Sequence, residues 1–152
     1  MKLEWQCTDF QSLTPHQLYA ILQARSAVFV VEQNCPYLDA DGADPDCDHL
    51  CAWTEDQQLA AYLRIVPPGL KYPEASLGRV ISTSVARGQG VGKQLLTNGI
   101  AQCRQRYPRH AIRIGAQHYL EKFYQSFGFA TVSEIYLEDD IPHVEMLLSV
   151  DL

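Results

Sequence analysis

The sequence predicts an α/β domain spanning residues 1–152, with a mixed sheet that is antiparallel except at one central parallel pair. One observation is a pair of apolar runs, 49–54 and 59–66, separated by four polar residues, which predicts an antiparallel hairpin. The other is a strand–helix–strand crossover, which makes the two strands that it connects parallel. Its elements are expected at residues 77–85, 92–107 and 111–116.

The N-terminal part should contain a strand at residues 3–7 and then a helix. Thr14 is suited to cap this helix, and Pro15 to occupy its first position, where a missing N–H is harmless. An apolar stripe follows at three- and four-residue steps, formed by Leu18, Ile21, Leu22, Val28 and Phe29. Arg25 lies in the same stripe, where a guanidinium needs a carboxylate or a bound anion. Either it pairs with the acidic loop that follows, or it shapes a substrate pocket.

The C-terminal part should begin with a short helix over residues 120–127. Gly128 is suited to end it, because glycine readily adopts the left-handed conformation of a C-cap. Two final strands are expected at residues 131–137 and 143–150, separated by a polar turn. No repeat, low-complexity tract or linker interrupts the chain, which favours one domain.

Composition and charge exclude several functional classes. The net charge of −6 and the pI near 5.2 argue against a general nucleic-acid or membrane-surface binder, and they favour a cationic acceptor such as an amine. No apolar run approaches the ~20 residues of a transmembrane helix. The first residues lack the apolar core of a signal peptide, so we expect a cytoplasmic protein.

Two clusters of possible metal ligands favour packing or solvent contact over a metal site. Cys47, His49 and Cys51 alternate along an extended segment, where core packing is natural, whereas closed zinc sites prefer Cys-x2-Cys loops. The five aspartates between residues 39 and 48 do not match a calcium loop, because Gly42 comes too early and no glutamate closes the loop. We therefore expect no metal, and an acidic loop that faces solvent or a partner.

A glycine-rich loop between the expected strand at 77–85 and the helix after it is the strongest functional signal. Gly88, Gly90 and Gly92 alternate with other residues and leave the backbone N–H groups uncovered. These N–H groups, together with the positive end of the helix dipole, can hold a phosphate or diphosphate. Arg87 and Lys93 add positive charge at either end of the loop.

Arg87-x-x-Gly90-x-Gly92 matches the Q/R-x-x-G-x-G/A signature of the GNAT family of acyl-CoA N-acyltransferases. Residues 123–129 resemble that family's second motif, an aromatic residue and Tyr124 followed by Gly-Phe, and the order of elements also matches. The chain resembles the family over essentially its whole length. Three further segments resemble the ElaA-like subgroup, at residues 25–44, 115–117 and 141–143.

This resemblance implies the GNAT fold, in which two parallel strands splay apart, and acetyl-CoA as the acyl donor. The glycine loop would hold the coenzyme diphosphate, and the backbone of the preceding strand would hold the pantetheine arm and polarise the thioester carbonyl. Gln117 stands where the family often has an asparagine that contacts pantetheine. The coenzyme-binding residues implied in this way are Val80, Ile81, Ser82, Arg87, Gly88, Gln89, Gly90, Val91, Gly92, Lys93, Gln117 and Tyr124.

The resemblance also implies that Tyr124 is the general acid that protonates the departing thiolate. The alternative is a core aromatic residue. Some members carry a glutamate as general base where this chain has Ile112. Glu32, His118, His143 and Glu145 are possible substitutes, as is a chain of water molecules.

The acceptor is expected to be a primary amine of a small molecule or peptide. Its pocket is expected to involve Arg25, Glu32, Asp44, His49 and His143. The first four could equally form a structural salt-bridge cluster. Two other functions remain open: an acyl-CoA-binding or sensing module without turnover, and an acyltransferase resembling acyl-homoserine-lactone synthases. The sequence does not indicate the oligomeric state.

Overall fold

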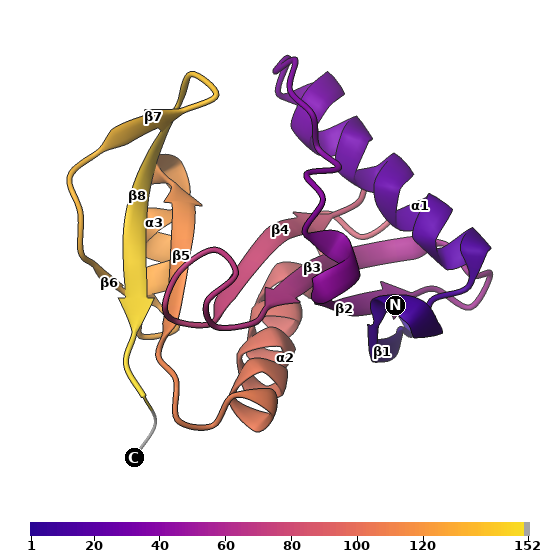
Figure 1. Cartoon of the computed structure of the whole chain (residues 1–152). Helices are drawn as coiled ribbons and strands as arrows, with labels where there is room; N and C mark the ends of the chain where they lie inside the picture. The colour runs from indigo at the N-terminus through magenta and orange to yellow at the C-terminus, as the bar shows by residue number, and fades with distance from the viewer. Residues whose placement is uncertain (151–152) are drawn as a thin grey trace.

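The computed structural model describes residues 1–150, and its strands form two four-stranded antiparallel sheets. In the first sheet the strand order is β1-β2-β3-β4, with β1 Glu4–Asp9, β2 Asp48–Trp53, β3 Leu59–Val66 and β4 Ser76–Ser82. The second is centred on β8 (Ile141–Leu148), which pairs with β5 Ile112–Gln117, β6 Ala130–Thr131 and β7 Tyr136–Glu138. Figure 1 shows the two sheets diverging, with β5 and β8 standing apart from β4.

The parallel pair at the centre of the fold is a single bridge. Ala75 and Ile112 are bridged in parallel, and the Arg113 N–H donates to the Ala75 carbonyl at 2.8 Å. Beyond that point β4 and β5 separate. The predicted mixed sheet with one splayed parallel pair is therefore confirmed, with the splay nearly complete.

The first sheet is covered by α1 (Pro15–Arg25) on one face and α2 (Val91–Arg106) on the other. The predicted cap of α1 is confirmed, because Thr14 Oγ1 accepts from the Gln17 N–H at 3.1 Å and the Gln17 side chain accepts from the Thr14 N–H at 3.0 Å. A π-helical segment, Ser26–Glu32, extends α1. Among residues 1–150, no helix is long and apolar enough to cross a membrane.

Two predicted strands are shorter than expected. Residues 131–137 do not form one strand, because the Ser133 hydroxyl accepts the Glu145 N–H at 2.8 Å and so takes a place in the ladder between β6 and β7. The strand expected at 77–85 ends at Ser82, after which a turn begins. The short helix α3 (Glu121–Gln125) lies within the predicted range, and Gly128 has the expected positive φ of 101°.

The expectation of an acidic loop that faces solvent or a partner is wrong for two of its five aspartates. Asp39 and Asp44 are each only 6% exposed, and the Arg25 guanidinium donates to both, at 2.8 Å to Asp39 and 2.7 Å to Asp44. Arg64 bonds to Asp41 at 2.6 Å and to Asp44 at 2.9 Å. These ion pairs hold the loop after α1 against β3. Arg25 therefore pairs with the loop, one of the two interpretations left open by the sequence.

Candidate active site

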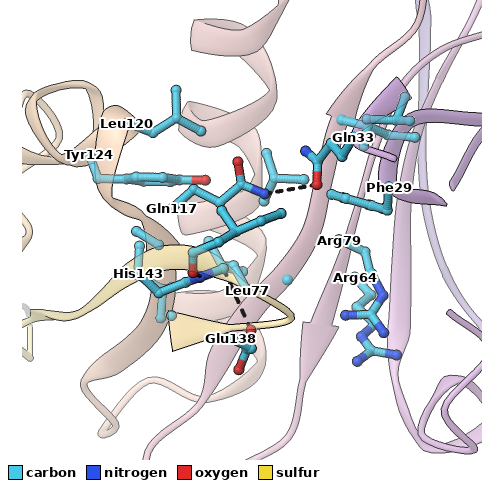
Figure 2. A pocket seen from close by; sticks show the side chains of 18 of the residues that line it. Phe29, Gln33, Arg64, Leu77, Arg79, Gln117, Leu120, Tyr124, Glu138 and His143 are labelled. Carbon is cyan, nitrogen blue, oxygen red and sulfur yellow. Dashed lines mark hydrogen bonds and ion pairs between the residues drawn. The ribbon is translucent and has the colours of Figure 1, made fainter. Parts of the chain in front are cut away.

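A cavity of about 520 Å³ lies where β4 and β5 diverge. Its walls come from both strands, the start of α2, α3, the π-helical segment Ser26–Glu32 with the loop after it, and the β7–β8 hairpin. The volume is in the range of sites for small molecules and cofactors. Figure 2 shows the side chains that reach into it.

One wall of the cavity is the open edge of β4. Val80, Ile81 and Ser82 line it. This strand pairs with β3 on one edge, and within residues 1–150 its other edge meets β5 only through the bridge at Ala75. Backbone N–H and carbonyl groups on that edge are therefore available to a ligand.

The glycine loop lies at the end of this wall. Gly88 and Gly90 have positive φ values of 80° and 73°, and a Cβ at either position would meet no atom within 4 Å. The space above the loop is thus open, and Gly92 at the start of α2 lines the cavity. This arrangement can hold a diphosphate. Of the other predicted loop residues, Gln89 and Lys93 are exposed, and Val91 is buried in the first turn of α2.

Arg87 spans the cavity mouth. Its Nε donates to the Ser82 carbonyl at 3.2 Å, and its two terminal nitrogens donate to the Glu32 carboxylate at 3.1 and 2.8 Å. The Arg87 guanidinium lowers the pKa of the Glu32 carboxyl. A diphosphate bound by the loop would compete with Glu32 for this cation.

Tyr124 projects from α3 into the cavity and is only 6% exposed. Its ring packs edge-on against Phe123 and Phe129, with centroid distances of 5.3 and 6.0 Å. Burial raises the pKa of the phenol above its ordinary value, at which it is already protonated at neutral pH. Figure 2 shows the hydroxyl directed toward the side of the cavity where Gln117 lies.

Gln117, the last residue of β5, contacts the segment after α1. Its side-chain Nε2 donates to Gln33 Oε1 at 3.2 Å (Figure 2). Both residues line the cavity. The bond holds the segment after α1 over the place where β4 and β5 separate.

The far end of the cavity is formed by the β7–β8 hairpin. His143 is 7% exposed, and its Nδ1 lies 2.7 Å from the Ile141 carbonyl. Its Nε2 lies 3.6 Å from a Glu138 carboxylate oxygen. Figure 2 shows this pair below Tyr124.

Of the five residues predicted for the acceptor pocket, Glu32 and His143 line the cavity. Arg25, Asp44 and His49 lie behind its wall. His49 bonds to the Tyr62 hydroxyl at 2.6 Å and to the Asp44 carbonyl at 3.0 Å, and burial lowers its pKa. These contacts are those of a structural cluster, the alternative that the sequence left open.

Sequence reasoning missed Arg64 and Arg79, which both line the cavity. Arg79 has a positive φ of 52°, pairs with Asp39 at 2.8 Å and lies over the Tyr37 ring at 5.7 Å. Arg64 had a usable signal, because it interrupts the apolar run 59–66 as Arg25 interrupts its stripe. Arg79 had none, because its conformation depends on a local irregularity in the β3–β4 pairing.

A family model for the acetyltransferase (GNAT) domain matches residues 43–150. Protein ElaA of Escherichia coli is 45% identical over 150 residues, which cover 97% of each chain. The chain belongs to the GNAT acetyltransferase family. Two crystal structures are similar to this GNAT protein: Escherichia coli ElaA, with a TM-score of 0.91 and 44% identity, and an acyl-CoA N-acyltransferase from Pseudomonas aeruginosa, with 0.92 and 43%. Each match covers 97% of this chain and 100% of the other.

Membership of the GNAT family makes this protein an ElaA-like acyltransferase with an acyl-CoA donor. The cavity fits such a donor, since a loop of open backbone N–H groups and an unpaired strand edge lie along one wall. Among residues 1–150, no group of three or more His, Cys, Asp or Glu side chains is placed to hold a metal ion.

Proposed function

We propose that this GNAT protein transfers an acetyl group from acetyl-CoA to the primary amine of a small molecule or peptide, by direct attack of the amine on the thioester. One observation carries this proposal: a single cavity extends from the glycine loop, past Tyr124, to the β7–β8 hairpin. Such a cavity has room for the reacting ends of donor and acceptor together. Holding both in place removes much of the entropic cost of the reaction.

The donor would be held mainly by backbone. Residues 88–93 and the N-terminus of α2 would bind the diphosphate, with Arg87 as an added cation. The pantetheine arm would lie along Val80–Ser82, with Gln117 on the opposite side. A backbone N–H of this strand edge would stabilise the negative charge that develops on the thioester oxygen.

Tyr124 would act as the general acid. The departing thiolate needs a proton, and a phenol, which is protonated at neutral pH, can donate one. Its hydroxyl faces the cavity between the open edge of β4 and the end of β5.

The test is thiol release from acetyl-CoA, measured over a panel of amines, amino acids and peptides. For Tyr124→Phe we expect kcat to fall by about 10²- to 10⁴-fold while coenzyme binding is retained. Tyr19→Phe is a matched control, because Tyr19 is 71% exposed on α1. An unchanged kcat in Tyr124→Phe would refute the acid role. Tight coenzyme binding without turnover of any acceptor would instead support a sensing module.

A further inference from the structure

The proposed reaction needs a group that takes a proton from the acceptor. A primary amine has a pKa near ~10, so at neutral pH it arrives as an ammonium ion, which cannot attack a thioester. Tyr124 cannot fill this role, because its phenol is already protonated. The base must line the cavity and have an accessible lone pair at neutral pH.

Most titratable groups on the cavity wall fail this requirement. Glu32 is bonded to Arg87 at the mouth, away from the hairpin. Burial raises the pKa of the Tyr37 phenol to about 12, and burial also raises the pKa of the Cys35 thiol. Glu138 and Asp139 are exposed carboxylates on the hairpin, which can attract an ammonium ion but are weaker proton acceptors than an imidazole.

Two candidates from the sequence lie outside the cavity wall. His118 is 44% exposed and contacts Glu121 at 3.7 Å. Glu145 pairs with Arg113 at 3.2 Å. Neither lines the cavity. His143 does.

The contacts of His143 leave one ring nitrogen free to accept a proton. Because Nδ1 lies 2.7 Å from the Ile141 carbonyl, which can only accept, Nδ1 carries the hydrogen and Nε2 carries the lone pair. Nε2 is 3.6 Å from Glu138, which is beyond a hydrogen bond but close enough to stabilise a charged imidazolium.

The register of the second sheet places this nitrogen beside the proposed reaction centre. His143 pairs directly with Gln117 across β5 and β8, so both side chains lie on the same face of the sheet. Gln117 reaches across the gap above the open edge of β4. The Tyr124 hydroxyl points from α3 toward Gln117, and His143 lies below Tyr124 (Figure 2).

We propose that His143 is the general base of this enzyme and that Glu138 receives the ammonium group of the acceptor. This inference rests on the proposed acyl transfer and names the end of the cavity where the amine binds. The ligand class is a primary amine that is protonated in solution.

The protons and electron pairs balance in two steps. His143 Nε2 takes one proton from the ammonium, and the neutral nitrogen forms a bond to the thioester carbon. As the carbon–sulfur bond breaks, Tyr124 gives its proton to the sulfur and takes the second proton from the new amide nitrogen. His143 then releases its proton to solvent, and Tyr124 ends as it began.

The test compares two acceptors of similar size in the full-length enzyme, methylamine and hydroxylamine. Methylamine is protonated at pH 7, whereas hydroxylamine is already neutral and needs no base before attack. For His143→Gln we expect kcat/KM to fall about 10²- to 10⁴-fold with methylamine and less than about tenfold with hydroxylamine. His118→Gln, the same substitution at an exposed site, should change neither. Equal losses with both amines, at unchanged coenzyme binding, would overturn the proposal.

NMR of the His143 ring nitrogens gives a readout that does not require activity. His143 lies near Glu138 and Tyr136 from β7, and its partner on β5 is Gln117. We expect the Nδ1–H tautomer, which leaves the lone pair on Nε2. If wild-type enzyme acylates neither amine, the proposed function fails for them, and the tautomer still tests the assignment of the base. The opposite tautomer would refute it.

Discussion

Replacing Asp44 by alanine should destabilise the fold by about 3–5 kcal/mol. Asp44 is 6% exposed, and one of its carboxylate oxygens accepts from Arg25 at 2.7 Å and from Arg64 at 2.9 Å. Each hydrogen bond to a charged group contributes about 1.5–3 kcal/mol, so the two bonds that Asp44 accepts account for a similar loss of stability. Arg25 keeps Asp39 and Arg64 keeps Asp41 as partners, so the lower end of the range is expected.

Urea unfolding at pH 7 measures this change. Asp46→Ala is the matched control, because Asp46 is exposed in the same short 3₁₀ turn as Asp44 and should change the free energy of unfolding by no more than about 0.5 kcal/mol. Asp44→Asn should fall between the two, because the amide oxygen can still accept while the charge is lost. If Asp44→Ala unfolds with the same free energy as Asp46→Ala, the ion pairs do not hold the loop and the reasoning is wrong.

The same pair of variants predicts a pH dependence. Burial alone would raise the pKa of Asp44, but Arg25 and Arg64 lower it below the ordinary value. A carboxyl whose pKa is depressed in the folded state stabilises that state above its unfolded pKa, near ~4, and loses this contribution as the pH falls further. The stability difference between wild type and Asp44→Ala should therefore shrink as the pH is lowered from about 5 to 2. A constant difference would contradict the depressed pKa.

Three further changes test the coenzyme end and the core. Glu32→Gln should tighten coenzyme A binding by up to about fivefold at low salt, because the residue at position 32 no longer competes for Arg87. The gain should not be larger, because an exposed ion pair contributes little free energy. Calorimetry should show that the gain in affinity fades at high salt. Gly90→Ala should cost about 1–2 kcal/mol of stability, seen in urea unfolding, because a φ of 73° strains any residue with a Cβ. Gly99→Ala raises the helix propensity of α2, yet it should destabilise the protein by up to about 2 kcal/mol. The reason is that the new Cβ would lie 2.6 Å from the Leu63 side chain. A melting temperature above that of the wild type would refute this prediction.

Local rules predicted the parts of the fold that local chemistry determines. Thr14 caps α1 and Gly128 ends the turn after α3, because each needs only a few neighbouring residues to act. The acidic loop was predicted wrongly for the opposite reason. Five aspartates in ten residues indicate solvent when only the local sequence is considered, yet the partners of Asp41 and Asp44 include Arg64, 20 or more residues away. Such pairing is visible only once β3 and the loop are placed together.

The two ends of the cavity differ in the same way, and this difference explains why the sequence indicated the donor better than the acceptor. The proposed donor end is made of backbone, so it requires glycines and a strand edge and leaves a compact signature at residues 87–92. The proposed acceptor end is made of side chains from β4, the loop after α1 and the β7–β8 hairpin, which no single motif contains. Substitutions at Glu138 or Tyr37 should therefore change which amine is used without changing coenzyme binding, whereas substitutions in the glycine loop should do the reverse.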